Sequence, residues 1–371
     1  MTKVSRTRLT TLAFVLLAVA LLVPERSPAQ GESAVPFLLI APTSRTAGMG
    51  EAGTGWVDDA SAIYWNPGGL AFQEGYEVSL THTNWLPQFQ LPDLFYDYLN
   101  YRMRIDEIDG TISLSITYLN LGKFSVTTSA GPEVVDEFKS YEYAITAGYA
   151  TRVFDDLGVG VNARFIHSAL SPIGTETEKG EGIASTVSFD VALMWRPQGE
   201  GIFGKNFSAG FNLQNLGPKV TYIDADQADP LPTNLRVGLG YKILEDEFNS
   251  LQFGFDATKL LVRRYDDGTS DPFYEAIFTA WGDSAAFKRI IWSTGLEYWY
   301  GSPKLIAIRA GYFHEAQGFG GRQYLTFGAG IRYDIYGFDF SYISPTGPEG
   351  SDHPLADTIR FSLLIAWGAG D

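Results

Sequence analysis

From Tyr76 to its end, the chain repeats a segment in which apolar and polar residues alternate, followed by a turn. The last of these segments is the clearest, because Ile359, Phe361 and Leu363 share one face while Arg360 falls on the other. A period of two residues is that of a β-strand, whose successive side chains point to opposite faces. Each segment holds about ten residues, which is the length that a tilted strand needs to cross the hydrocarbon core of a membrane.

Fourteen such segments occur, near residues 76–85, 94–104, 111–121, 140–152, 157–169, 184–196, 206–215, 234–243, 251–259, 291–299, 304–313, 322–333, 336–343 and 358–367. The number is even, as an antiparallel barrel requires when both of its ends lie on one side. Forty glycines and an aromatic content of 14% also favour a barrel over a helical membrane protein. We therefore predict an all-β fold, in which residues 73–371 form an antiparallel transmembrane β-barrel of about 14 strands.

The connections between the predicted strands fall into two classes. If the first strand runs outward, the inner turns are all short, at residues 105–110, 153–156, 197–205, 244–250, 300–303 and 334–335. Most of the outer connections are long, at residues 122–139, 170–183, 216–233, 260–290 and 344–357. Short turns on one side and long loops on the other are typical of outer-membrane barrels, and a soluble β-sandwich would not be expected to keep this asymmetry.

Residues 1–29 have the pattern of a secretory signal peptide. Basic residues precede an apolar run, and the small residues Ser27 and Ala29 stand where signal peptidase requires them. We therefore expect export through the Sec pathway and insertion into an outer membrane. The chain has no cysteine, which excludes disulfide bonds and thiol-based sites.

The mature chain is strongly acidic. Cleavage of the signal peptide removes four basic residues and one acidic residue, which lowers the formal net charge by three, from −16 to −19. An acidic surface argues against nucleic acid as a partner. It also argues against docking on anionic lipid through a basic face.

Residues 30–72 match neither the signal peptide nor the strands. The apolar run from Val35 to Ile40 is too short to span a bilayer, and it is followed by a stretch rich in glycine. Small residues let a peptide thread a confined space and adopt positive φ angles. We predict that this segment is a hatch inside the barrel lumen, and its candidate functional residues are Arg45, Gly48, Gly50, Asn66 and Pro67.

One motif in the hatch points to a different function. Gly48, Gly50 and Gly53 satisfy the GxGxxG pattern of dinucleotide-binding proteins. That pattern requires a strand before it, a helix after it and a βαβ unit around it. Here a signal peptide precedes it and antiparallel strands follow, so we predict close packing of backbone and no cofactor.

Charged residues of both signs occupy the polar face of the predicted strands. They would be costly in lipid, so the alternation must place them in the lumen. They can line a polar transport path, or they can form a network that holds the hatch and fills the interior. We favour the network, whose candidate members are Arg164, Arg236, Asp256, Glu297, Arg309, Arg332 and Arg360.

Candidate catalytic and metal-binding residues are sparse. None of the four histidines has metal-ligand spacing with another, and no nucleophile elbow supports a Ser-His-acid hydrolase. The acidic stretch from Asp224 to Asp229 can hold Ca²⁺, but it lacks the glycine and the distal glutamate of an EF-hand. We interpret it as a solvated loop and expect no enzyme activity, no cofactor and no metal.

The long outer connection 260–290 contains an aromatic stripe. Its aromatic residues recur at roughly helical spacing and predict an amphipathic segment outside the barrel. This segment either packs over the barrel mouth or binds a protein partner, for which aromatic side chains are favoured anchors. The candidate residues on this and the other outer loops are Phe89, Tyr222, Tyr265, Phe273, Tyr274 and Trp281.

Several stretches resemble the PorV/PorQ family of type IX secretion proteins. They are Val35-Pro36-Phe37-Leu38-Leu39-Ile40-Ala41-Pro42, Tyr64-Trp65-Asn66-Pro67, Ile308-Arg309-Ala310-Gly311-Tyr312-Phe313 and Gln323-Tyr324-Leu325-Thr326-Phe327-Gly328-Ala329-Gly330. The resemblance covers essentially the whole mature chain and implies the architecture of FadL-type barrels, with fourteen strands and a hatch. Those barrels have Asn-Pro-Ala in the hatch, where this chain has Gly68 in the third position.

The resemblance also implies a role in secretion. A PorV-like protein sits in outer-membrane lipid beside the large translocon barrel and binds the C-terminal signal domain of exported cargo. It then delivers the cargo to the surface attachment complex, which contains a sortase-like protease.

An alternative is a FadL-like transporter of hydrophobic small molecules, which needs a continuous apolar pocket and a lateral opening. A lipid A deacylase would need a lipid-facing Ser/His pair, and no convincing pair is present.

Overall fold

The computed structural model describes residues 33–368, apart from 92, 129–130, 172–180, 284, 348–349 and 351–352. The predicted signal peptide, residues 1–29, lies outside the described residues. Among the described residues, no helix has both the length and the apolar character needed to span a membrane.

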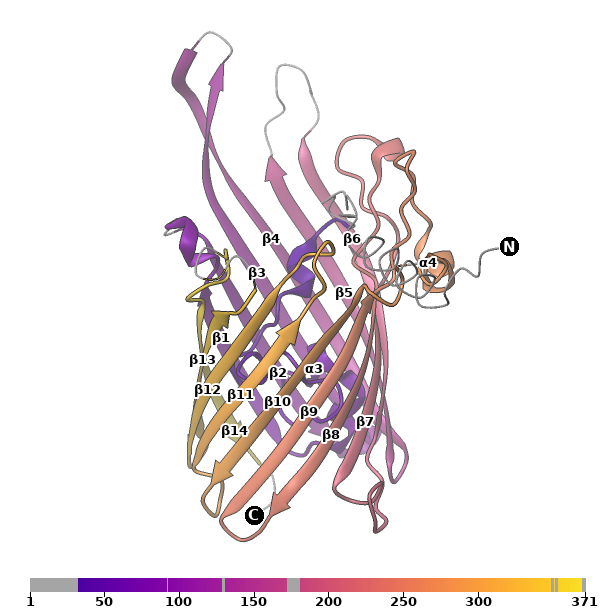
Figure 1. Ribbon diagram of the computed structural model, residues 1–371, viewed down its shortest axis with the longest axis vertical. Coiled ribbons are helices and arrows are strands. Elements are labelled where there is room, and N and C mark those ends of the chain that lie inside the picture. Colours follow the sequence, from indigo (N-terminus) through magenta and orange to yellow (C-terminus); the bar gives the residue numbers. More distant parts are fainter. Residues whose placement is uncertain are drawn as a thin grey trace, which may run out of the picture.

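The described chain forms a closed barrel of fourteen antiparallel strands in which each strand pairs with its sequence neighbours and β1 pairs with β14 (Figure 1). The strands are β1 (Tyr76–Asn84), β2 (Phe95–Ile105), β3 (Gly110–Thr128), β4 (Gly131–Phe154), β5 (Leu157–Ser171), β6 (Gly182–Trp195), β7 (Phe207–Leu216), β8 (Asn234–Glu245), β9 (Asn249–Leu260), β10 (Ile290–Tyr300), β11 (Ile306–His314), β12 (Gln323–Tyr333), β13 (Tyr336–Pro345) and β14 (Ile359–Trp367). The prediction of an all-β, fourteen-stranded barrel from period-two alternation is therefore confirmed.

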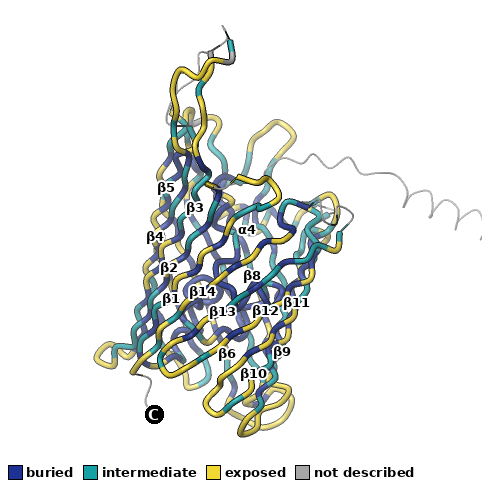
Figure 2. The backbone as a smooth tube through the Cα atoms, turned by 90° about the vertical axis from the view of Figure 1, so that its left-hand side faces the viewer, coloured by how far each residue is buried: buried dark blue, intermediate teal, exposed yellow. Residues whose placement is uncertain are grey.

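Burial alternates along the strands as the sequence pattern predicts (Figure 2). In β14, Ile359, Phe361 and Leu363 are exposed on the outside, whereas Arg360 and Ser362 between them are buried in the lumen. A shift of the strand pairing by one residue would exchange the two faces, so the alternation fixes the register of the whole barrel.

Aromatic side chains gather near both ends of the outward face. Phe95, Tyr118 and Tyr141 form a continuous row close to the end that carries the long connections, which we name the outer end, with ring centroids 6.0 and 6.2 Å apart. At the opposite end, Tyr76 stacks on Trp367 at 5.5 Å. Two aromatic girdles with an apolar band between them are the arrangement that a bilayer with two polar interfaces favours.

The connection expected at 122–139 is not a loop. Strands β3 and β4 continue as a two-stranded hairpin beyond β2 and β5, whose pairing with them stops at Asn120 and Tyr141 (Figure 1). The two strands keep bonding to each other past a register shift at Asn120, and Phe124 stacks on Phe138 at 5.6 Å. Alternation alone could not reveal this hairpin, because both of its faces lie in solvent. Most of the connection expected at 170–183 lies outside the described residues.

The helices are short and lie either in the N-terminal segment or in the connections. The α-helices are α2 (Ser44–Ala47), α3 (Ala62–Trp65) and α4 (Phe273–Thr279), and the 3-10 helices are η1 (Pro36–Leu39), η2 (Pro67–Phe72), η3 (Pro87–Phe89), η4 (Asp106–Ile108) and η5 (Ala225–Gln227). The four that precede β1 belong to the hatch, residues 34–72, which fills the lumen (Figure 1).

The hatch runs along the lumen from its outer end to its inner end. At the outer end, the Ala34 N–H donates to the carbonyl of Pro230, in the connection between β7 and β8, at 2.9 Å. At the inner end, η2 leads directly into β1. In between, hatch residues form the centre of the largest buried apolar cluster, and Phe37, Ile63 and Trp65 are fully buried in it.

Two hatch glycines make the close approach to the barrel wall possible. Gly50 has a φ of +66°, and a Cβ there would lie 2.5 Å from the Thr294 carbonyl oxygen. A Cβ on Gly48 would meet the Cα of Gly328 at 3.1 Å. The backbone of the hatch therefore lies directly against the strands, which is the packing predicted for these glycines in place of a nucleotide site.

Candidate functional site

Arg45, on α2, is the main ionic link between the hatch and the barrel. Its guanidinium donates to both carboxylate oxygens of Glu297, on β10, at 2.8 and 2.7 Å. Its third nitrogen contacts Asp58 at 2.5 Å and Asp59 at 2.9 Å, both in the hatch. The ring of Trp56 covers the guanidinium at 4.9 Å. This bidentate pairing orients the side chain as well as neutralising it.

The Arg45 link continues around the barrel wall. Glu297 also accepts a hydrogen bond from Arg309 on β11 at 2.7 Å, and Arg309 donates to Asp339 on β13 at 2.8 Å. Asp339 in turn accepts from Arg332 on β12 at 2.7 Å. The resulting network, Arg45–Glu297–Arg309–Asp339–Arg332, connects the hatch to four consecutive strands. Removing one member would leave a buried charge without its partner, which typically costs about 3–5 kcal/mol.

Asp58 shows the electrostatic effect of this network. Burial raises the pKa of its carboxyl, but the charges of Arg45, Lys304 and Arg196 together outweigh burial and lower the pKa to about 2. Asp58 therefore stays ionised at any physiological pH and holds Arg45 from the hatch side. Asp59 has a second role, because its carboxylate also accepts from the Ser61 N–H, just before α3, at 2.9 Å.

Asp256 and Arg236 hold the middle of the hatch. One carboxylate oxygen of Asp256, on β9, accepts from the N–H groups of Gly53 and Thr54 at 2.9 Å each. Arg236, on β8, lies over the ring of Trp65 at 4.8 Å and donates to Gln214 at 3.0 Å. These contacts fix hatch backbone and aromatic rings against the same wall of the barrel.

Asn66 and Pro67 end α3 and tie it to the wall. Asn66 is extended, and its side-chain amide donates to the carbonyls of Thr54 at 2.8 Å and Leu193, on β6, at 2.9 Å. Its side-chain oxygen accepts from the Gly68 N–H at 3.0 Å, which starts η2 at Pro67. One asparagine thus shapes the turn and bonds it to the barrel.

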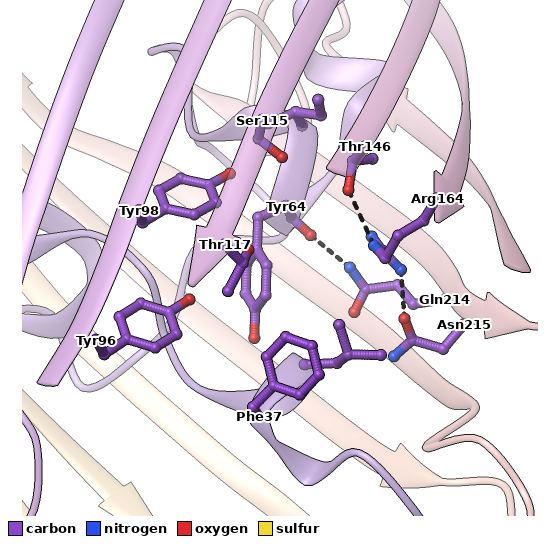
Figure 3. A pocket seen from close by; sticks show the side chains of 12 residues that line it. Phe37, Tyr64, Tyr96, Tyr98, Ser115, Thr117, Thr146, Arg164, Gln214 and Asn215 are labelled. Carbon is purple, nitrogen blue, oxygen red and sulfur yellow. Dashed lines mark hydrogen bonds between the residues drawn. The ribbon is translucent and has the colours of Figure 1, made fainter. Parts of the chain in front are cut away.

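A small cavity lies between the hatch and strands β2 to β7. Phe37, Tyr64, Tyr96 and Tyr98 surround it, and Arg164 at its edge pairs with Asp190 at 2.7 Å (Figure 3). Its volume is about 10 Å³, enough for about one water molecule. Pockets for small hydrophobic ligands typically measure roughly 300–1,000 Å³. This cavity is therefore too small to hold such a ligand.

An exposed aromatic patch lies at the outer end, on the connection between β9 and β10. Helix α4 confirms the helix expected there, and it presents Tyr274 and Phe278 to solvent. We define the outer aromatic patch as Tyr274, Phe278 and Phe287, whose exposed fractions are 58, 77 and 74%. Trp281 links them, because it follows Phe278 by three residues and its ring lies 6.1 Å from that of Phe287. Three large exposed rings on one connection make this patch a candidate interaction surface.

Two further aromatic candidates on this connection contribute differently. The ring of Trp281 is half-buried beside Lys259, and its indole N–H donates to the Ile277 carbonyl at 3.1 Å. Phe273 is half-buried and packs edge-on against Tyr274 at 5.5 Å. Both side chains pack against rings of the patch, Phe273 against Tyr274 and Trp281 against Phe287. Phe287 was not among the sequence candidates, because it follows the helix and has no periodic signal.

The remaining loop candidates are scattered. Tyr265 is exposed on the same connection, where its hydroxyl donates to Asp271 at 3.1 Å. Phe89 is exposed on η3, and strands β11 to β14 separate its loop from the outer aromatic patch in the barrel order. Tyr222 turns inward, donates to Ser168 at 2.9 Å and packs against the lumen core.

The inward-facing charges that the alternation predicts all lie in the lumen, but their surroundings differ. Arg164, Arg236, Asp256, Glu297, Arg309 and Arg332 have hydrogen-bond partners there. Arg360 differs from these, because its Nε and Nη1 atoms have no hydrogen-bond partner within the described part of the chain, and its guanidinium lies over the ring of Trp85. Sequence reasoning missed Asp339 as a member of the network, although it lies on the polar face of β13.

In the acidic stretch near Asp224, Asp229 forms an ion pair with Arg264, and the described residues contain no group of three potential metal ligands.

The sequence matches the family described as Type IX secretion system protein PorV over residues 27–267. No curated protein matches it significantly. The structure is similar to the Ralstonia pickettii toluene transporter TbuX, with a TM-score of 0.50 and 14% identity, over 90% of this chain and 100% of that chain. It is also similar to the Pseudomonas putida toluene transporter TodX, with a TM-score of 0.50 and 11% identity, over 86% and 96% of the two chains. A Pseudomonas aeruginosa FadL homologue has a TM-score of 0.48 and 13% identity, over 88% and 98%.

At these identities, the likeness to TbuX and TodX shows the fold, which is the FadL-like barrel that the sequence resemblance implied. It is consistent with a place in the outer membrane. The family match is independent of that likeness and spans the hatch and the strands up to β9. Because this match covers more than half of the chain, the protein belongs to the PorV family of type IX secretion system proteins.

Proposed function

We propose that this protein binds the C-terminal signal domain of cargo at the type IX translocon and carries it to the surface attachment complex. The observation that supports this most is the contrast between the lumen and the outer surface. The lumen is filled by a hatch that is held through buried ion pairs, whereas three large aromatic rings are exposed at the outer end.

A barrel of this kind is suited to carrying a partner on its surface. With the hatch in place, the lumen offers space for about one water molecule beside Tyr64. Function is therefore expected at surfaces that face lipid, the periplasm or the outside. The expected partners are the translocon barrel, the C-terminal domains of secreted cargo and the sortase-like attachment complex, with outer-membrane lipid around the barrel after export through the Sec pathway. None of these roles requires catalysis.

The outer aromatic patch is the part of that surface we assign to the cargo domain. Phe278 and Phe287 are exposed over about three quarters of their area, and water-exposed aromatic rings gain most from burial in a protein interface. The half-buried Phe273 and Trp281 pack against Tyr274 and Phe287 and so position the patch, and Tyr265 lies on the same connection.

The test compares two variants expressed in cells with a type IX system. A double variant, Phe278→Ser with Phe287→Ser, should insert normally but lose co-purification with cargo C-terminal domains after light crosslinking. Phe89→Ser, which removes an exposed ring on a distant outer loop, should keep it. Normal cargo capture by the double variant would remove the patch from the mechanism. Recovery of the native barrel without any secretion component, but with bound lipid or fatty acid, would favour the transporter alternative.

A further inference from the structure

Arg360 is a buried cation at the seam that closes the barrel. It lies on β14, opposite Thr83 of β1 on one side and Ser341 of β13 on the other. Its exposed fraction is 1%, and Thr83 and Ser341 are equally buried on the same inward face. Thr358, two residues before Arg360, is also fully buried on this face. Three strands therefore bring one guanidinium and three hydroxyls together.

Five buried side-chain atoms of this cluster have no hydrogen-bond partner within the described part of the chain. This holds for Nε and Nη1 of Arg360 and for the hydroxyls of Thr83, Ser341 and Thr358. Elsewhere in the lumen, Arg309 has two carboxylate partners. Buried polar groups are nearly always satisfied, and a buried charge is costly unless an opposite charge accompanies it.

The surroundings of Arg360 are aromatic. The ring of Trp85 lies over the guanidinium at 5.8 Å, and Tyr96 pairs with Thr83 across β1 and β2. Tyr324 interacts electrostatically with Arg360, and its hydroxyl donates a hydrogen bond to the Glu51 carboxylate at 2.8 Å. The carboxylates of Glu297 and Asp339, which also face the lumen, pair with other arginines. Among the described residues, Arg360 therefore has a cation–π contact but no carboxylate in an ion pair with it.

We propose that Arg360, Thr83, Ser341 and Thr358 form a binding site for a small monovalent inorganic anion such as chloride. A guanidinium supplies the charge and several fork-like donors, and hydroxyl groups supply neutral donors that rotate to suit. Water would satisfy the donors but leave the charge uncompensated. The tight burial of all four side chains selects a compact anion over the head of a long amphiphile. The bound anion would brace the β1–β14 closure and the loop that carries Trp85.

The test uses the full protein purified in mild detergent, with bromide as the probe. Crystals soaked in bromide should give an anomalous peak beside Arg360, where an uncharged water would give none. At constant ionic strength, replacing gluconate by chloride or bromide should raise the thermal midpoint of the wild type saturably. The variant Arg360→Gln should lose this halide dependence.

A second, more conservative variant tests the same site in case Arg360→Gln does not fold. Thr358→Val replaces one hydroxyl by a methyl group of similar volume and should weaken bromide binding roughly three- to tenfold, as expected for one lost hydrogen bond. The proposal is overturned if the wild type shows no halide dependence, if Arg360→Gln keeps it, or if the anomalous peak is missing. A halide peak found only at exposed lysines would mark an adventitious ion only and would equally overturn the proposal.

Discussion

At the scale of single residues, Arg45 decides whether the hatch is fixed. Its side chain pairs with two hatch carboxylates and with a barrel carboxylate at the same time. Glu297 is fully buried and Asp59 largely so, and water therefore screens these two pairs less than it screens surface pairs, whereas Asp58 is partly exposed. A few charged side chains therefore account for much of the binding between the hatch and the barrel.

Replacing Arg45 by methionine keeps much of its volume but removes its charge. We expect the free energy of unfolding to fall by about 3–5 kcal/mol, because Glu297 and Asp59 lose a buried partner. The measurement is the thermal midpoint in detergent, followed by heat-modifiable migration on gels. The control is Lys242→Met, which breaks an exposed pair with Glu245 and should cost less than about 1 kcal/mol. Equal effects of the two variants would contradict the network.

The pKa of Asp58 predicts how the stability of the protein with its hatch in place depends on pH. Its folded-state pKa is lowered to about 2, below the value of roughly 4 expected in an unfolded chain. The stabilisation is therefore fully present above pH ~4 and is lost as the pH falls through ~2. Thermal melts between these limits should show a smaller pH dependence for Asp58→Asn than for the wild type. An unchanged dependence would mean that Asp58 does not contribute.

At the scale of elements, the hatch is shaped by glycine rather than by helix propensity. Its α-helices contain only four residues each, so packing against strands, and not local hydrogen bonding, must hold them. The long connections differ from the hatch, because α4 and the β3–β4 hairpin extend outward and keep exposed aromatic or apolar side chains.

Gly50 should tolerate no side chain. Its φ is positive, and a Cβ would collide with the backbone of β10 and β11, so Gly50→Ala should destabilise the barrel by at least about 1–3 kcal/mol. Gly199→Ala is the matched control, because nothing lies within 4 Å of a Cβ there. Thermal midpoints of the two variants give the comparison, and a wild-type midpoint for Gly50→Ala would refute the close contact.

Much of the architecture could be predicted from the sequence, and the reasons are physical. Alternation such as that of Ile359 to Leu363 is imposed by lipid on one face and a polar lumen on the other, so it reports strand number directly. Partners far apart in sequence cannot be read this way. Arg45 and Glu297 are 252 residues apart, and only the folded barrel brings them together. The hairpin beyond Leu121 and the exposed ring of Phe287 carry no periodic signal, because solvent surrounds them.

At the scale of the whole molecule, the protein is a closed wall around a filled lumen. The wall needs no edge protection, because β1 and β14 complete it. The hatch takes the place of the water or ligand that a barrel of this size would otherwise enclose. Interaction with other proteins is then left to the outer face and the connections.

Deleting residues 34–70 tests this view of the lumen. The shortened barrel should either conduct ions across a planar bilayer or melt at a much lower temperature, because its inward charges lose the hatch groups that pair with them. The wild type should show little steady conductance in the same experiment. A deletion variant with wild-type melting and no conductance would show that the hatch neither seals nor stabilises the barrel.

The path of the hatch has a consequence for how the molecule is assembled in the membrane. Ala34 bonds at the outer end, and the ion-pair network that begins at Arg45 extends through β10 and β11 to β13, which are among the last strands to be synthesised. A finished barrel could not be threaded afterwards by a segment that contains Trp56 and Trp65 packed against its walls. The sheet must instead curl around a hatch that is already in place, and the final β1–β14 pairing closes over it. Assembly would then be sensitive to the hatch, because a chain with a faulty hatch would complete the last seam less efficiently.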